Sequence, residues 1–294
     1  ANWGVTQVDE LHWMDLPPIS AIEQAKTLLK ELNAIDNKGN ITEHGRDILK
    51  LGTHPRLAHM MLAAQKLNQT YHACLIASLL SEKDIYQNNH NKNTGIHDRL
   101  KILLHTESQT HQHGMDKLQC KRVLQTAYDF LRRIKKSDTT LKISEDNIKA
   151  RINDDLTGVL LAYSYPDRVG KRRKGNEARY LLSNGKGAII PPFLQHHLHE
   201  YLVVANLDDK QGEACIYLAA EISAEQLQEY FSDIIQQEDR VEWNEYTERV
   251  EARQTLSIGK IILQESNLVD EKNSQTKEKI QQCLIQAIKE TKLA

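Results

Sequence analysis

The spacing of apolar residues changes at Pro166, and this change divides the chain into a helical part and a strand-forming part. Before Pro166, apolar residues recur at helical intervals. After it, short apolar runs such as 201–207 and 214–219 alternate with turn signals. With 294 residues, the chain is too long for one ordinary core. The sequence therefore predicts a multidomain α+β protein.

The first part of the chain predicts a connector followed by part of a winged-helix unit. Residues 1–18 show no clear apolar period and are assigned to the connector. Residues 19–54 predict a helix, a small hairpin and a second helix, the tail of such a unit. Ser20 and Glu23 have the spacing of a capping box, and Thr42 is placed to cap the second helix.

Residues 55–165 predict a helical bundle. Pro55 suits the first position of the helix PRLAHMMLAAQKL. The next helix, TYHACLIASLLSEKDI, is apolar on most of its surface, so we expect it to be buried. Further helical patterns cover 96–105, 115–136 and 144–163.

Residues 166–268 predict a small, partly open β-barrel with an inserted helix, and the OB-fold is the common example. Asn184-Gly185 is a strong hairpin signal between two short strands. Ser223 and Gln226 have capping-box spacing, which predicts a helix through Ile235. The segments VEWNEYTERVEARQT and SIGKIILQES are expected to supply the remaining strands. Residues 269–294 predict a C-terminal amphipathic helix.

The strand-forming part begins with a basic stretch. The chain has a net charge of −2, yet seven basic residues and one acidic residue give residues 168–186 a net charge of +6. One interpretation is a solvated loop before the hairpin. The other is a nucleic-acid site, in which Lys and Arg pair with phosphates and an exposed Tyr180 stacks on a base. The candidate nucleic-acid-binding residues are Arg168, Lys171, Arg172, Arg173, Lys174, Arg179, Tyr180 and Lys186.

The same stretch, from Gly170 to Gly175, has the opening spacing of a phosphate-binding P-loop. Four residues separate the two glycines, as in the motif, but the motif also needs a Lys and then a Ser or Thr directly after the second glycine. Here Asn176 and Glu177 follow, so a carboxylate would lie close to the phosphates. The segment is therefore not expected to bind a nucleotide, and the glycines fit turns better.

No other pattern predicts catalysis or a cofactor. The histidine groups at 111–113 and 196–199 have no cysteine near them, so neither has the ligand set of structural zinc. A metal-dependent enzyme built on them is the least favoured hypothesis. The isolated cysteines indicate a reducing, cytoplasmic compartment. No apolar run is long enough to predict a membrane span. We therefore expect no catalytic residue, no metal site and no membrane partner.

The segment MDLPPISAIEQAKTLLKELNAIDNKGNITEHGRDILKLGTHPRLAHMMLAA resembles the region just after the motor of DEAH-box helicases. In that family a D-PP segment leads into the signature LxxLxAxDxxGxLTxxGRxxxxLxxxPRLAxML. Ile41 departs from the usual leucine. The matching residues are Leu29, Leu32, Ala34, Asp36, Gly39, Ile41, Thr42, Gly45, Arg46, Leu51, Pro55, Arg56, Leu57, Ala58, Met60 and Met61.

The second half is similar to one bacterial group of these helicases. The similarity lies in LLAYSYPDRVGKRR, ARYLLSNGKGAII, EYLVVANLDD, IYLAAEIS and RVEWNEYTERVEARQTLSIGKIIL. Together the two resemblances cover nearly the whole chain, least securely at 85–145 and after 268. They imply a winged-helix remnant, a helical "ratchet" (HA2-like) bundle and an OB-like module.

The resemblance also implies a function. The family consists of ATP-dependent RNA helicases whose two RecA-like motor domains bind ATP and Mg²⁺. This sequence shows neither a Walker A motif nor a DEAH box, so no catalytic residue is carried over. We expect an accessory region, inactive as an ATPase by itself, that guides single-stranded RNA or DNA beside the motor. The alternative is a docking module for an activator protein, because in related helicases activators attach to the OB-like domain.

Overall fold

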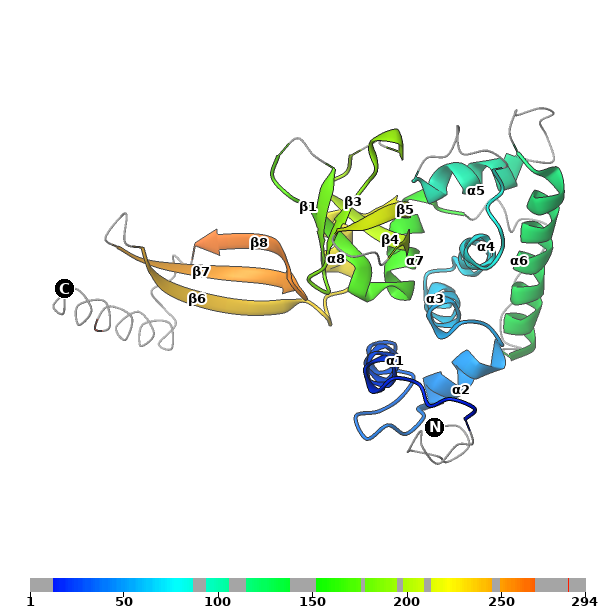
Figure 1. Ribbon diagram of the computed structural model, residues 1–294, viewed down its shortest axis with the longest axis horizontal. Helices are drawn as coiled ribbons and strands as arrows, with labels where there is room; N and C mark the ends of the chain where they lie inside the picture. Colours follow the sequence, from blue (N-terminus) through cyan, green and yellow to red (C-terminus); the bar gives the residue numbers. More distant parts are fainter. Residues whose placement is uncertain are drawn as a thin grey trace.

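The computed structural model describes residues 13–86, 94–105, 115–137, 152–175, 178–194, 198–208, 213–244, 249–267 and Ile285. The predicted C-terminal helix lies outside these residues apart from Ile285, and so does most of the expected connector. Helices pack at one end of the molecule, a barrel lies in the middle, and a separate sheet projects at the other end (Figure 1). The α+β class is confirmed.

The helical half begins at α1 and ends at α7, which a short 3₁₀ turn (Asp154–Leu156) precedes. Residues 138–151, which carry the first part of the helix expected at 144–163, lie outside the described residues. The helices are α1 (Ile19–Glu31), α2 (Glu43–Lys50), α3 (Pro55–Lys66), α4 (Thr70–Ser81), α5 (Ile96–His105), α6 (Lys117–Ser137) and α7 (Thr157–Ser164).

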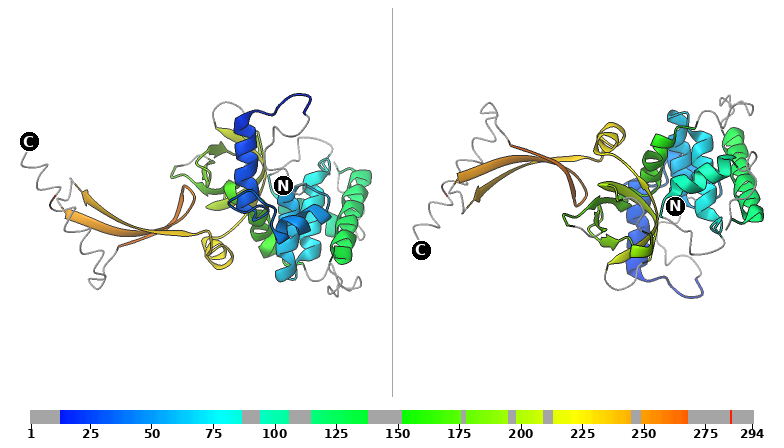
Figure 2. Two further views of the ribbon diagram at one scale, coloured as in Figure 1. Left: turned by 90° about the horizontal axis from the view of Figure 1, so that it is seen from below. Right: turned by 90° about the horizontal axis from the view of Figure 1, so that it is seen from above.

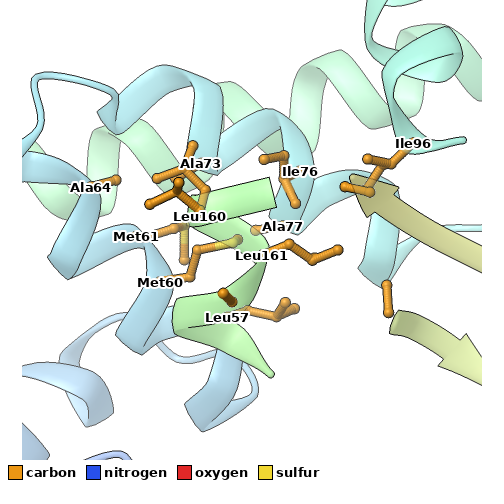
Figure 3. Close-up of a cluster of buried hydrophobic side chains, with 14 of the residues drawn as sticks. Leu57, Met60, Met61, Ala64, Ala73, Ile76, Ala77, Ile96, Leu160 and Leu161 are labelled. Carbon is orange, nitrogen blue, oxygen red and sulfur yellow. The ribbon is translucent and has the colours of Figure 1, made fainter. Parts of the chain in front are cut away.

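Helix α4 lies at the centre of the bundle and confirms the expected burial. Every residue of α4 from Thr70 to Leu79 is buried, because α3, α5, α6 and α7 all pack against it. Figure 3 shows part of this core, where apolar side chains of α3, α4, α5 and α7 pack together. The labelled residues are Leu57, Met60, Met61, Ala64, Ala73, Ile76, Ala77, Ile96, Leu160 and Leu161.

The first residues of the observed helices test the capping predictions. The Thr42 side chain accepts a hydrogen bond from the Gly45 backbone, as expected. Pro55 occupies the first turn of α3, also as expected. The Ser20 prediction is wrong: α1 begins at Ile19, and Pro18 precedes it without a side-chain cap. A proline before the helix already fixes the backbone there, so the helix starts two residues earlier.

The barrel closes with five strands in the order β1-β2-β3-β5-β4. Strand β3 runs parallel to β5, and the other neighbours are antiparallel. The Asn184-Gly185 turn joins β2 to β3, so the predicted hairpin is confirmed. The strands are β1 (Val169–Arg172), β2 (Arg179–Leu182), β3 (Gly187–Ile189), β4 (Tyr201–Leu207) and β5 (Ala214–Glu221).

The later strands do not join this barrel, which corrects the expected extent of the β domain. Helix α8 (Ala224–Tyr230) follows the barrel instead of being inserted in it, and it ends before Ile235. The expected loop at 169–172 forms β1, which pairs with both β2 and β4 and closes the ring. A closed ring leaves no free edge for a further strand.

The remaining strands therefore form a sheet of their own, in the order β6-β7-β8 (Figures 1 and 2). Its β7–β8 turn rests on the barrel, where the Lys260 backbone donates to the Ser183 carbonyl at 2.9 Å. The other end of the sheet points away from the rest of the molecule. The strands are β6 (Gln236–Asn244), β7 (Arg249–Ile258) and β8 (Ile261–Asn267).

Helix α7 joins the bundle to the barrel. A Cβ atom at Gly158 would overlap the Glu221 carbonyl oxygen, so only glycine lets α7 lie this close to β5. A buried ion pair supports the same junction: the Arg56 guanidinium binds the Asp167 carboxylate at 2.6 and 3.0 Å. Arg56 also donates to the Ser164 carbonyl at 3.0 Å. The two halves are thus fixed to each other by packing and by charge.

Two imidazoles lie inside the helical half. The His72 ring lies 3.2 Å from the Thr157 hydroxyl, between α4 and α7. Burial, with a smaller contribution from His97, lowers the pKa of His72 to about 4. Burial and neighbouring His44 lower the pKa of His59 to about 4 as well. Both rings are therefore neutral in the folded protein at pH 7.

Acidification should destabilise the fold through these two rings. In the unfolded chain each imidazole takes up a proton near its ordinary pKa of 6.5, whereas the folded protein resists protonation until about pH 4. Stability is thus fully present above pH 6.5 and is lost as the pH falls toward 4. Between pH 7 and pH 5 each ring should lower the free energy of unfolding by about 2 kcal/mol, measurable by urea denaturation. The His72→Gln variant should lose about half of this dependence, and an unchanged pH profile would contradict the assignment.

Candidate nucleic-acid interface

The basic stretch lies on the side of the barrel that the helices leave open. Strand β4 is buried on both faces, because it packs on the barrel interior and on α7. Strands β2 and β3 instead turn one face to solvent, where Arg179 is exposed and Leu181 is half-buried. The loop between β1 and β2 extends from this face. This face of the barrel is therefore the candidate binding surface.

Tyr180 is not on that surface, so its predicted exposure is wrong. Its relative accessibility is 0%, and the ring packs inside the barrel. The hydroxyl donates to the His199 carbonyl at 3.0 Å. Burial raises the pKa of Tyr180, and nearby Arg172 opposes this. Side chains alternate along a strand, and in β2 the inward face carries Tyr180 and Leu182. This ring is therefore not available to stack on a base.

Arg168 and Lys171 take part in internal contacts. The Arg168 guanidinium donates to the Ala205 carbonyl at 3.2 Å and lies over the Tyr165 ring. The Lys171 ammonium donates to the Ile262 carbonyl at 2.8 Å and lies over the Tyr201 ring. These contacts attach the barrel to the helical half and to the projecting sheet. Both side chains thus have structural roles.

Arg173 and Arg179 share one counter-charge. The Glu213 carboxylate lies 3.3 Å from the Arg179 guanidinium and 3.8 Å from that of Arg173. All three side chains are partly exposed, so these ion pairs are weak and salt-screened. A phosphate can compete with the Glu213 carboxylate for these guanidinium groups. The pair remains available to an anion, with its charge partly offset.

The remaining cations are Arg172, Lys174 and Lys186. Arg172 is half-buried at the end of β1, and Lys174 is exposed in the loop before Gly175. Within the described ranges, neither Arg172 nor Lys174 forms an ion pair. Lys186 is exposed in the β2–β3 turn. The structure thus reduces the predicted set to the β1–β2 loop, the β2–β3 turn and Arg179 on the outer face of β2.

Sequence reasoning missed the other groups on this surface. Glu213 is distant in sequence and reaches the arginines only because β5 lies beside β3. Tyr217 on β5 is 38% exposed, and its hydroxyl donates to the Asp208 carboxylate at 3.3 Å. Phe193, after β3, is 72% exposed. Tyr217 lies in an apolar run and Phe193 follows two prolines, so only the β3–β5 pairing would have revealed their exposure.

The histidine groups do not form a described metal site. His199 binds the Glu221 carboxylate, with 2.6 Å between Nδ1 and Oε2. Histidines 111, 113, 196 and 197 lie outside the described residues. Among the residues that are described, no cluster of three or more His, Cys, Asp or Glu side chains could hold a metal ion. In the same residues, no helix is both long and apolar enough to cross a bilayer.

Comparisons with known proteins show which class of protein this chain resembles. No family model matches the chain. Its sequence and fold nevertheless match one region of a bacterial DEAH-box helicase.

The particular relative is HrpB of Escherichia coli. The chain is 26% identical to the ATP-dependent RNA helicase HrpB of strain K12 over 263 residues, 88% of this chain and 28% of that protein. It also matches a crystal structure of the E. coli DExH-box NTPase HrpB with a TM-score of 0.71 and 26% identity. That match covers 93% of this chain and 30% of the other. A second structure, of the DEAH/RHA helicase HrpB, gives a TM-score of 0.70 at 24% identity, covering 95% and 31%.

The resemblance inferred from sequence is therefore confirmed, and the bacterial group that it indicated is HrpB. The chain spans less than a third of the length of the relatives that it matches. The similarity is thus to one region of HrpB.

The Tyr180→Phe variant tests the corrected role of this tyrosine. Removing the hydroxyl leaves the His199 carbonyl without its donor, so the variant should lose about 1 kcal/mol of unfolding free energy. Its affinity for single-stranded RNA should match that of the unmodified chain, measured by fluorescence anisotropy. An unchanged free energy of unfolding would contradict the structural role of the Tyr180 hydroxyl.

Proposed function

We propose that this chain is an accessory region of an ATP-dependent DEAH-box RNA helicase, which binds and guides single-stranded nucleic acid beside the RecA-like motor. The observation that carries this proposal is the HrpB-like sequence and fold along nearly the whole chain. In the proposal, ATP and Mg²⁺ bind in the motor domains, and this region does not hydrolyse ATP by itself. A cytoplasmic location belongs to the same proposal.

Finer assignments of the fold also belong to the proposal. Helices α1 and α2, with the bridge between Ile35 and Ile41, form the tail of a winged helix. Helices α3 to α7 form the ratchet (HA2-like) bundle. The barrel is OB-like: its five strands close in one ring, and β3 runs parallel to β5.

The barrel supports a nucleic-acid role through the position of its cations. OB-type barrels bind oligonucleotides on the face of strands 2 and 3 and through the loops after strands 1 and 4. In this barrel, the loop after β1 carries Arg173 and Lys174, and the outer face of β2 carries Arg179. The loop after β4 leads to Glu213, which pairs with both arginines. The cations therefore lie where such a barrel binds its ligand.

The expected contact is with phosphates and not with bases. Burial of Tyr180 removes one predicted stacking ring from the basic stretch. Tyr217 and Phe193 are the aromatic side chains of the described barrel that remain well exposed. Base stacking contributes affinity in proportion to the number of rings, so this surface should bind weakly and with little sequence preference.

A protein-docking role is favoured by a different observation. The residues around the start of α1 expose large apolar side chains, and α1 has no buried residue. We propose that the motor domains cover this face, whereas an activator protein is the second candidate occupant. A docking face of this kind depends little on salt, in contrast to a phosphate site. The exposed side chains are Trp13, Met14, Leu16 and Ile19.

Replacing the loop cations tests the nucleic-acid role. The variant Arg172→Ala/Arg173→Ala/Lys174→Ala should bind a labelled single-stranded RNA roughly tenfold more weakly at 50 mM salt. The slope of log K against log salt should become shallower by about 2, because three phosphate contacts are lost. Fluorescence anisotropy across a salt series measures both quantities.

The matched control is Lys26→Ala/Lys30→Ala/Lys38→Ala, which removes the same charge from α1 and the turn after it. This control should leave the affinity and the slope close to those of the unmodified chain. Equal losses in the two variants would show a general charge effect and contradict the proposed site.

A further inference from the structure

Helix α6 is a second strongly basic element, far from the barrel. It lies at the outer edge of the bundle, on the side opposite the barrel and the projecting sheet (Figures 1 and 2). Its apolar face packs on α4 through residues such as Val123, Ala127 and Ile134. The opposite face points to solvent along the whole helix.

This outer face carries most of the charge of the helix. Seven basic residues and one acidic residue give residues 117–137 a net charge of +6, on a chain whose total is −2. The helix thus matches the basic stretch of the barrel in net charge. The basic residues are Lys117, Lys121, Arg122, Arg132, Arg133, Lys135 and Lys136.

Some of these cations have protein partners and others do not. Arg132 pairs with Asp129 at 3.2 Å, and Arg133 donates to the Leu51 carbonyl at 2.9 Å. Four further cations are exposed, and none of them forms an ion pair with any described residue. We call these four residues the α6 stripe: Lys117, Lys121, Arg122 and Lys136.

Several cations of α6 are placed unfavourably for their own helix, although Lys136 lies in the last turn, where the helix dipole favours a cation. Lys117 and Lys121 are four residues apart, as are Arg132 and Lys136, and like charges at this spacing repel each other on a helix. Lys117 also lies in the first turn, where the helix dipole disfavours a cation, although Asp116 caps the turn. A bound polyanion would turn this repulsion into attraction.

The dimensions and chemistry of the stripe indicate its ligand. From Lys117 to Lys136 the helix rises by about 28 Å, long enough to run along the backbone of a duplex segment. The aromatic side chains of α6 face inward: Tyr128 packs against Tyr71, and Phe130 is buried. A face without exposed rings cannot stack unpaired bases, so it suits nucleic acid whose bases are already stacked on each other.

We propose that the α6 stripe binds the phosphate backbone of paired RNA, as a second nucleic-acid contact separate from the single-strand contact at the barrel. This inference rests on the proposed function for the identity of the polyanion as RNA. It assigns the two basic surfaces to different forms of one substrate: the barrel loop to the unpaired strand and α6 to a duplex segment.

The test compares two charge-removing variants of the whole chain on two RNAs. One variant is Lys117→Ala/Lys121→Ala/Arg122→Ala/Lys136→Ala, and the other is the triple loop variant described above. The probes are a blunt 12-base-pair RNA duplex and a 12-nucleotide oligouridine, with anisotropy measured from 50 to 200 mM salt. Alanine is the best helix former, so the α6 variant should remain folded, as circular dichroism will check.

The α6 variant should lose at least tenfold in duplex affinity at 50 mM salt and keep its affinity for oligouridine. Its salt slope for the duplex should become shallower by roughly 3 to 4, for four lost phosphate contacts. The matched control, Lys26→Ala/Lys30→Ala/Lys38→Ala/Lys66→Ala, should leave duplex binding unchanged.

Two results would overturn the proposal in distinguishable ways. In the first, duplex affinity is unchanged in the α6 variant while the loop variant still loses affinity for oligouridine. α6 then does not bind RNA, and an acidic protein partner becomes the candidate ligand of its exposed face. If neither variant changes binding of either RNA, the proposed nucleic-acid function fails as well.

Discussion

The close approach of α7 to β5 is the contact on which the arrangement of the whole molecule depends. Because Gly158 has no side chain, the helix can lie directly against the Glu221 carbonyl. The ion pair between Arg56 and Asp167 then fixes the start of α3 to the entrance of the barrel. A buried pair of this kind is costly to break, since one charge would remain without its partner. The bundle and the barrel are therefore held as one body, with α6 and the barrel loop at fixed positions on opposite sides.

In this rigid arrangement, the two basic segments of the chain are held at fixed positions on separate surfaces. The chain is acidic in total, yet two segments each carry a net charge of +6. In the barrel, Glu213 and internal carbonyl groups offset much of that charge, whereas four cations of α6 have no described partner. Exposed, unpaired cations contribute more to long-range attraction of a polyanion than cations already paired. The exposed face of α6, which carries no recognised motif, is thus a second strong electrostatic feature of this structure.

Sequence reasoning succeeded where a signal is local. The Thr42 cap, the start of α3 at Pro55 and the Ser223–Gln226 capping box each depend on a few neighbouring residues, and all are present. Sequence reasoning failed where the position of a residue depends on pairing between strands that are far apart in the sequence. Strand β1 forms because β4 lies beside it, and that pairing decides that Tyr180 points inward and that the barrel closes without β6. The counter-charge of Glu213 depends in the same way on the parallel pairing of β3 with β5.

The central claim is that this HrpB-like region contacts RNA through two separate basic surfaces on one rigid body. The most direct measurement is photo-crosslinking of the chain to an RNA hairpin with a single-stranded tail, followed by mass spectrometry of the crosslinked peptides. The account predicts crosslinks from the tail to peptides within 172–186 and from the stem to peptides of α6. Crosslinks confined to the exposed apolar face around α1, or absent from both basic segments, would contradict it.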